Sequence, residues 1–137
     1  MKREEIMEQE QKKILVVDDE APIADLIAEF CEIIGYKTRV IYNGKEVVNA
    51  VKQFCPDLIT LDLNMPDVPG ATILTVLKKD SDTRSIPVLI ISSNVDSTNP
   101  SQQMDESLKL SQAILPKPIE IKTLRMQIDK ALAKKGK

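Results

Sequence analysis

The sequence predicts an α/β domain in which a doubly wound, five-stranded parallel sheet carries five helices on its two faces. From residue 13 onward, short runs of apolar and β-branched residues alternate with longer stretches whose apolar residues recur at helical spacing, as in strand–helix units. The chain has 137 residues, of which 42% are hydrophobic, which suits a single core. We place the domain at residues 13–134. We expect an extension at 1–12 to fray and a basic tail to follow at 135–137.

The first part of the chain contains two strand–helix units. Lys13 to Val17 is the expected first strand, and the helix after it has its apolar face between Ile23 and Ile34. Gly35 is expected to end that helix. Polar and apolar residues alternate at Lys37 to Ile41, which indicates an edge strand, and Val47 to Phe54 has the apolar face of a second helix.

The middle of the chain repeats this pattern. We expect the third strand at Asp57 to Leu61, followed by a proline-containing loop at Met65 to Gly70. The next helix has its apolar face at Ile73 to Leu77. Pro87 to Ile91 is the most clearly marked strand of the sequence, and it is the fourth.

The last part of the chain is less regular. The segment Asn94 to Leu110 is polar, and we expect a mobile loop there with a weak fourth helix near Ser101 to Leu110. Gln112 to Leu115 is the expected fifth strand. After Pro118, apolar residues from Ile121 to Leu132 recur at helical spacing and predict the final helix.

Composition excludes several classes of function. The chain contains no histidine, which excludes a Ser-His-Asp triad and histidine-ligated zinc or iron. It has no glycine-rich phosphate loop, and no apolar run approaches the ~20 residues that a membrane span needs. Residues 1–13 lack the apolar segment of a secretory signal, so we expect a cytoplasmic protein. Cys31 and Cys55 have apolar neighbours, and we expect both to be buried, reduced thiols.

Basic residues gather toward the C-terminal end. Residues 117–137 contain seven bases and two acids, although the net charge of the chain is −2. Lysines near the end of the last helix complement its negative C-terminal pole. With only two tyrosines, two phenylalanines and no tryptophan, the chain offers no stacking platform for bases. We therefore expect neither a nucleic-acid partner nor a membrane contact.

Polar side chains follow four of the five expected strands. Residues 18–20 are Asp-Asp-Glu directly after the first strand, and Asp62 directly follows the third. Ser92 and Lys117 come after the fourth and fifth. Parallel strands share one carboxyl edge, so these groups should meet in a single crevice. Taken singly, each also has an ordinary explanation as a helix cap, a turn residue, a strand-end hydroxyl or a solvated base.

A cluster of aspartates needs compensating positive charge. Carboxylates brought together repel one another and raise each other's pKa, so the crevice calls for a divalent cation and a lysine. Oxygen ligands of this kind favour Mg²⁺ over zinc and leave coordination positions for water and a phosphoryl oxygen. The sequence therefore indicates phosphoryl chemistry, with a carboxylate as nucleophile.

Four motifs resemble one known family, the receiver (CheY-like) domains of two-component response regulators. They are ILVVDDE at 14–20, DLNMPDVPG at 62–70, PVLIISS at 87–93 and PKPI at 116–119. The resemblance covers residues 12–134. It implies a flavodoxin-like sheet with strand order 2-1-3-4-5.

The resemblance also implies roles for individual residues. Asp62 would be the phosphoacceptor, Ser92 the hydroxyl that hydrogen-bonds the phosphoryl group, and Lys117 the ammonium beside it. The bond between Lys117 and Pro118 would be cis.

A Mg²⁺ ion is the implied cofactor. Asp19 would bind it directly and Asp18 largely through metal-bound water, and Asp62 is also among the expected metal-binding residues. Asn64 would contribute its backbone carbonyl.

The family's reaction would make this chain a signalling phosphoacceptor and not a turnover enzyme. It would take a phosphoryl group from a phosphohistidine on a histidine kinase or histidine phosphotransfer protein, catalyse that transfer itself, and later lose the group to water. Because the resemblance uses almost the whole length, we expect a stand-alone regulator that signals through protein contacts. Its downstream target is expected on the face formed by the fourth helix, the fifth strand and the last helix.

That face departs from the family's pattern. Ile114 stands where many receivers have an aromatic residue, and Leu110-Ser111 replaces a common Gly-Ala pair. Isoleucine lacks the ring and polar handle of an aromatic switch. Pro116 fits an edge strand but not a central one.

Two alternatives stay open at this point. The chain could be a receiver-like binding module that acts independently of phosphorylation, as the altered face suggests. It could also be a small-molecule phosphatase with an aspartate nucleophile. The phosphatase would normally need an acidic residue two positions after its nucleophile, where this chain has Asn64.

Overall fold

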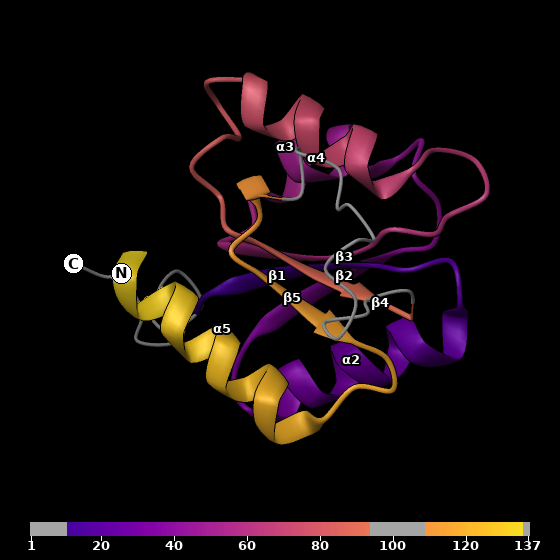
Figure 1. Cartoon of the computed structure of the whole chain (residues 1–137). Coiled ribbons are helices and arrows are strands. Elements are labelled where there is room, and N and C mark those ends of the chain that lie inside the picture. The colour runs from indigo at the N-terminus through magenta and orange to yellow at the C-terminus, as the bar shows by residue number, and fades with distance from the viewer. Residues whose placement is uncertain (1–10, 94–108, 136–137) are drawn as a thin grey trace.

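The fold is built on a parallel sheet whose strands were placed correctly by the apolar runs. The computed structural model describes residues 11–93 and 109–135. Its five parallel strands lie in the order β2-β1-β3-β4-β5, which confirms the expected order (Figure 1). They are β1 (Lys13–Val17), β2 (Lys37–Ile41), β3 (Leu58–Asp62), β4 (Val88–Ser92) and β5 (Ala113–Pro116).

The edge strands show the features that their sequences predict. In β2, only Ile41 is buried, as its alternating pattern indicates. At the opposite edge, Pro116 ends β5 in register with Ser92 of β4. Proline lacks a backbone N–H and cannot donate a hydrogen bond to a neighbouring strand. It is therefore tolerated in an edge strand, which has a neighbouring strand on one side only.

Four helices lie in the described part of the chain, where the sequence predicts five in the whole chain. They are α2 (Ala21–Ile33), α3 (Val47–Phe54), α4 (Gly70–Lys79) and α5 (Ile121–Lys135). The fifth expected helix, near Ser101 to Leu110, falls mostly outside the described residues. Only Lys109 and Leu110 of it are described, and they form a short 3₁₀ turn. The expected fraying of residues 1–12 likewise lies almost wholly outside the described part.

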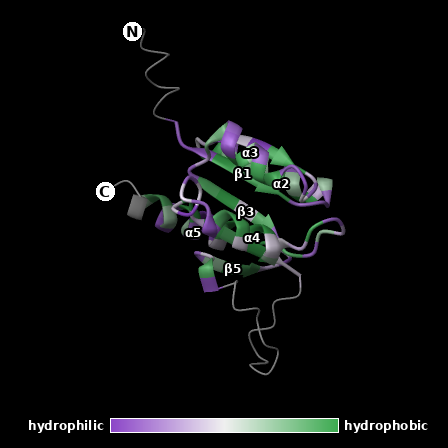
Figure 2. Ribbon diagram, turned by 90° about the horizontal axis from the view of Figure 1, so that it is seen from above, coloured by the Kyte–Doolittle hydropathy of each residue, from purple (hydrophilic) through white to green (hydrophobic). Residues whose placement is uncertain are grey.

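The helices cover both faces of the sheet, with α3 and α4 on one side and α2 and α5 on the other (Figure 1). Alternate residues of each central strand face opposite layers: Leu15 packs with α3 and α4, whereas Ile14 packs with α2 and α5. Every residue of β3 and β4 is buried, which explains their nearly continuous apolar sequences. In Figure 2 the central strands β1 and β3 are accordingly coloured hydrophobic.

The two cysteines are free thiols, as expected, but only one of them is buried. Burial raises the pKa of Cys31 to about 12, which keeps this thiol protonated and unreactive. Cys55 is exposed, so its expected burial is wrong. It follows the last residue of α3 with a φ of 53°, and this left-handed end turns the residue away from the core.

Gly35 ends α2 as predicted. Its φ of 105° lies in the region that favours glycine, and the adjacent Tyr36 N–H donates to the carbonyl of Cys31 at 2.9 Å. Within the described residues, no helix is both long and apolar enough to cross a membrane.

Candidate functional site

The polar residues that end four strands meet at the carboxyl edge of the sheet. Asp18 directly follows β1, Asp62 ends β3, Ser92 ends β4 and Lys117 directly follows β5. Backbone hydrogen bonds fix these positions: the Lys117 N–H donates to the Ser92 carbonyl at 3.0 Å, and the Asp18 N–H donates to the carbonyl of Ile41 at 3.1 Å. The structure therefore brings together the groups that the sequence assigned to one crevice.

Three carboxylates form the centre of this crevice. One oxygen from each of Asp18, Asp19 and Asp62 lies within 4.8 Å of the other two. Asp18 and Asp62 are 1% and 3% exposed, whereas Asp19 is open to solvent. Two of the three negative charges are thus removed from water, which costs free energy unless they are compensated.

The Lys117 ammonium compensates part of this negative charge. Its Nζ lies 2.8 Å from Asp18 Oδ2, 3.2 Å from Glu20 Oε1 and 3.6 Å from Asp62 Oδ1. Only 8% of its side chain is exposed. Burial works against its charge, but the Asp18, Asp62 and Glu20 carboxylates outweigh burial and raise the pKa of Lys117.

One cation does not balance the cluster. Burial, followed by the charge of Asp18, raises the pKa of Asp62 from 3.8 to about 6. The Lys117 ammonium and the Asn64 backbone N–H lower it only in part. The crevice therefore holds a carboxylate whose ionisation would be helped by further positive charge.

The donor set fits a hard divalent cation. Asp18 Oδ1 accepts the Glu20 N–H at 2.9 Å, but the buried Oδ2 receives no hydrogen bond from the described residues, although it pairs electrostatically with Lys117. A buried carboxylate oxygen that pairs with an ammonium and lies beside two further carboxylates is the arrangement that Mg²⁺ would complete. Asp18, Asp19 and Asp62 are the side chains able to hold it.

Asn64 contacts both Ser92 and Asp62. The side-chain amide of Asn64 donates to Ser92 Oγ at 3.2 Å, and its backbone N–H lowers the pKa of Asp62. Ser92 is buried and Asn64 is exposed. The metal contact expected from the Asn64 carbonyl stays a prediction.

Sequence reasoning missed two contacts of this site. The Asn64–Ser92 hydrogen bond joins residues 28 positions apart, and Glu20 was given no role although it pairs with Lys117. The acid at position 20 was visible directly after the aspartate pair. The sequence does not show that the Glu20 side chain points toward β5, because this direction depends on the path of the chain into α2.

The loop after β3 is held by close packing at Gly70. The Gly70 N–H donates to the Leu63 carbonyl at 3.0 Å. A Cβ at this position would lie 2.6 Å from both the Asp62 carbonyl oxygen and the Leu63 Cα. Only glycine lets α4 begin this close to the backbone of Asp62.

Replacing Gly70 with alanine should therefore affect both stability and the site. We expect the free energy of unfolding to fall by about 1–3 kcal/mol, because the clash is with backbone that cannot turn away. Urea denaturation measures this, with Thr72→Ala as a control on the exposed side of the same helix, expected within about 0.5 kcal/mol of wild type. A Gly70→Ala protein as stable as the control would contradict the account of this loop.

Asp67 ties the same loop to the segment before α3. Its carboxylate accepts the N–H groups of Gly44 and Lys45, each at 3.0 Å. The Gly44 N–H is the main cause of the lowered pKa of Asp67. The loop that carries Asn64 is thus held by the Gly70–Leu63 hydrogen bond across its ends and by Asp67 within it.

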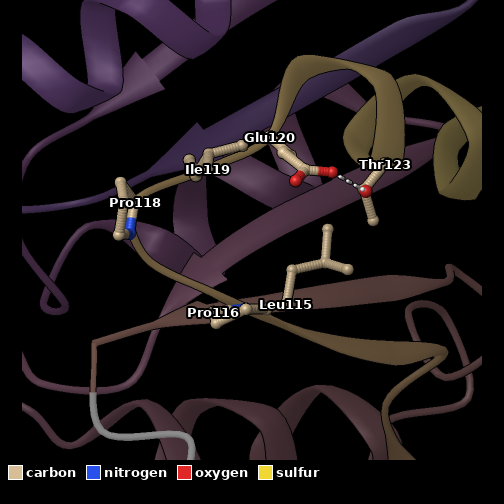
Figure 3. A pocket seen from close by; sticks show the side chains of 6 residues that line it. All are labelled: Leu115, Pro116, Pro118, Ile119, Glu120 and Thr123. Atoms are coloured by element: carbon tan, nitrogen blue, oxygen red, sulfur yellow. Dashed lines mark hydrogen bonds between the residues drawn. The ribbon is translucent and has the colours of Figure 1, made fainter.

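The face that departs from the family's pattern lies next to the site. Ile114 is half-buried opposite Ile90 and packs against the core beneath α3 and α4. The chain after β5 borders a hollow of about 180 Å³ (Figure 3). Its lining comprises Leu115, Pro116, Pro118, Ile119, Glu120 and Thr123. The Lys117–Pro118 bond beside it is cis, as the resemblance implies.

Comparison with known proteins agrees with this geometry. The profile of the response regulator receiver domain matches residues 14–129. The chain belongs to this family of two-component signalling domains.

Individual relatives extend the comparison. The DNA-binding response regulator MtrA of Mycobacterium tuberculosis is 32% identical over 93 residues, which are 68% of this chain but 40% of that protein. The receiver domain of a Francisella response regulator, 1452, is 30% identical with a TM-score of 0.78, covering 91% of this chain and 99% of that one. A CheY-like receiver from Methanospirillum hungatei has the same fold, with a TM-score of 0.78, 22% identity and coverage of 90% and 95%. The chain thus matches less than half the length of MtrA.

Proposed function

We propose that this chain is a signalling phosphoacceptor that receives a phosphoryl group on Asp62 with the help of Mg²⁺. The observation that carries the proposal is the buried Asp62 carboxylate, which has an oxygen within 4.8 Å of the Asp18 and Asp19 carboxylates and another contact, at 3.6 Å, with the Lys117 ammonium. A nucleophile in this position is close both to a candidate metal site and to a buried ammonium. Those are the two charges that phosphoryl transfer needs.

The proposed reaction is a simple displacement. A carboxylate oxygen of Asp62 attacks the phosphorus of a phosphohistidine, the P–N bond breaks, and its electron pair returns to the imidazole nitrogen, which takes up a proton. Lys117 would offset charge on the transferred oxygens, and Ser92 would donate its hydroxyl to one of them. The metal, when bound, would supply further charge neutralisation. Later attack by water would release inorganic phosphate and restore the carboxylate.

The phosphoryl donor would be a partner protein, because this chain contains no histidine. A histidine kinase or a histidine phosphotransfer protein has the required chemistry. We further propose that the signal leaves through protein contacts on β5 and α5. Exposed apolar side chains at Leu110, Ile121 and Met126 support this surface.

The expected absence of a nucleic-acid partner, free-standing action, the cytoplasmic address and the domain limits at 13–134 remain predictions. MtrA is described as DNA-binding. The chemistry proposed for Asp62 would be the same in a receiver domain with or without an attached DNA-binding domain.

Acetyl phosphate with Mg²⁺ tests the acceptor directly. We expect the intact mass to rise by one phosphoryl group, and we expect no rise with EDTA or in Asp62→Asn. Asp57→Asn is the matched control, since Asp57 lies at the other end of β3 and accepts the Lys13 N–H at 2.9 Å. It should still be phosphorylated.

The second candidate is a binding module that acts independently of phosphorylation. The half-buried Ile114 at the family's aromatic position favours it. A wild-type protein that gains no phosphoryl group under these conditions would support this candidate and contradict the proposal.

A further inference from the structure

Glu20 and the proposed phosphoacceptor, Asp62, both lie close to the Lys117 ammonium. Lys117 donates a hydrogen bond to Glu20 Oε1 at 3.2 Å, whereas Nζ is 3.6 Å from Asp62 Oδ1. In this state the ammonium is closer to Asp18 and Glu20 than to the acceptor.

The contact is not a by-product of helix capping. Glu20 occupies the N-cap position of α2, but its side chain makes no cap hydrogen bond. Glutamate is not among the residues preferred at that position. Its backbone is fixed at both groups: the N–H donates to Asp18 Oδ1 at 2.9 Å, and the carbonyl accepts the Ala24 N–H at 3.0 Å. The backbone of Glu20 is thus held in place, and its carboxylate pairs with Lys117.

Glu20 differs from the other partners of Lys117 in its relation to the metal. Asp18 and Asp62 belong to the carboxylate cluster, so a bound cation would neutralise part of their charge. Glu20 does not belong to that cluster, so it would keep its full negative charge and its ion pair with the Lys117 ammonium. Because 57% of its side chain is exposed, the carboxylate can also move into solvent at little cost.

We infer that Glu20 is a positioning residue that holds Lys117 back from the phosphoryl group, so that the Glu20–Lys117 pair must open when Asp62 is phosphorylated. This inference rests on the proposed function. No covalent step is added. When Lys117 turns to the phosphoryl group, it loses its contact with Glu20. The free energy of that lost contact is subtracted from the free energy gained with the phosphoryl group.

Affinity for beryllofluoride at saturating Mg²⁺, measured by NMR titration, tests the inference. Glu20→Gln removes the charge, and Glu20→Asp keeps the charge but shortens the side chain by one methylene. We expect both to bind beryllofluoride more tightly than wild type, by about threefold for Glu20→Gln, which is the range of an exposed ion pair. Asp25→Asn is the matched control. It removes an exposed acid on α2 that hydrogen-bonds the Tyr42 hydroxyl at 2.6 Å, away from Lys117.

Affinity for Mg²⁺ alone separates positioning from a structural defect. A disturbed site would weaken Mg²⁺ and beryllofluoride together, whereas loss of the pair should tighten beryllofluoride while Mg²⁺ binding is unchanged or slightly weaker. The inference is overturned if Glu20→Gln matches Asp25→Asn, if either Glu20 variant binds beryllofluoride more weakly than wild type, or if Glu20→Asp equals wild type. A wild-type protein that fails to bind beryllofluoride with Mg²⁺ would instead remove the proposed function itself.

Discussion

Replacing Asp62 with asparagine is expected to stabilise the metal-free protein at pH 7.5 while abolishing phosphorylation. Burial and the nearby Asp18 raise the pKa of Asp62 from 3.8 to about 6. The folded state therefore binds this proton more tightly than the unfolded state. The stabilisation that comes from this tighter proton binding is lost as the pH rises from about 4 through about 6. Above that range the ionised, buried Asp62 carboxylate lowers the stability of the folded state by its full amount. A shift of this size corresponds to as much as about 3 kcal/mol.

Urea denaturation in EDTA at pH 5.0 and 7.5 measures this effect. Asp62→Asn should exceed wild type by about 1–3 kcal/mol at the higher pH, and the difference should shrink as pH falls toward 4. Mg²⁺ should stabilise wild type more than the variant, because the metal relieves the same repulsion. Asp57→Asn, at the other end of β3, should show no such pH-dependent gain. An Asp62→Asn protein that is less stable than wild type at pH 7.5 would contradict this account of the cluster.

Replacing Lys117 with methionine is expected to have the opposite effect on stability. The ammonium is 2.8 Å from Asp18 and 3.6 Å from Asp62, and both carboxylates are buried. Removing one partner of a buried ion pair leaves the other uncompensated, which typically costs about 3 kcal/mol or more. Because Lys117 lowers the pKa of Asp62, its loss should raise that pKa further, so the destabilisation should grow with pH.

Phosphorylation of the Lys117→Met protein should also slow. A fixed cation that offsets charge on the transferred group is worth about 100-fold or more in rate. Acetyl phosphate labelling, followed by intact mass, measures the rate, and Lys122→Met on the exposed side of α5 is the control. Wild-type stability together with a wild-type rate in Lys117→Met would show that this ammonium does not organise the site.

The sequence was most informative where one physical requirement dominates. β3 and β4 are buried on both faces, so nearly every position has to be apolar, and the strands were recognised within a residue at each end. The strand ends then placed Asp18, Asp62 and Ser92 at one edge, because parallel strands share a direction. Gly35 ended α2 for a local reason, its positive φ.

The sequence was less informative where side-chain direction depends on tertiary packing. Cys55 has apolar neighbours along the chain, yet the left-handed turn after α3 exposes it. The contacts of Asn64 with Ser92 and of Glu20 with Lys117 join segments far apart in the sequence. No local pattern encodes such pairs, because they depend on how separate loops meet above the sheet.

A two-step NMR titration tests the central claim most directly, namely that the carboxylates and Lys117 form one phosphoryl site around one Mg²⁺. Mg²⁺ alone should shift the backbone amides of Asp18, Asp19, Asp62 and Asn64. Beryllofluoride should then shift Ser92 and Lys117, and only in the presence of Mg²⁺. Amides at these positions that do not respond to Mg²⁺, or a beryllofluoride response that persists in EDTA, would contradict the account.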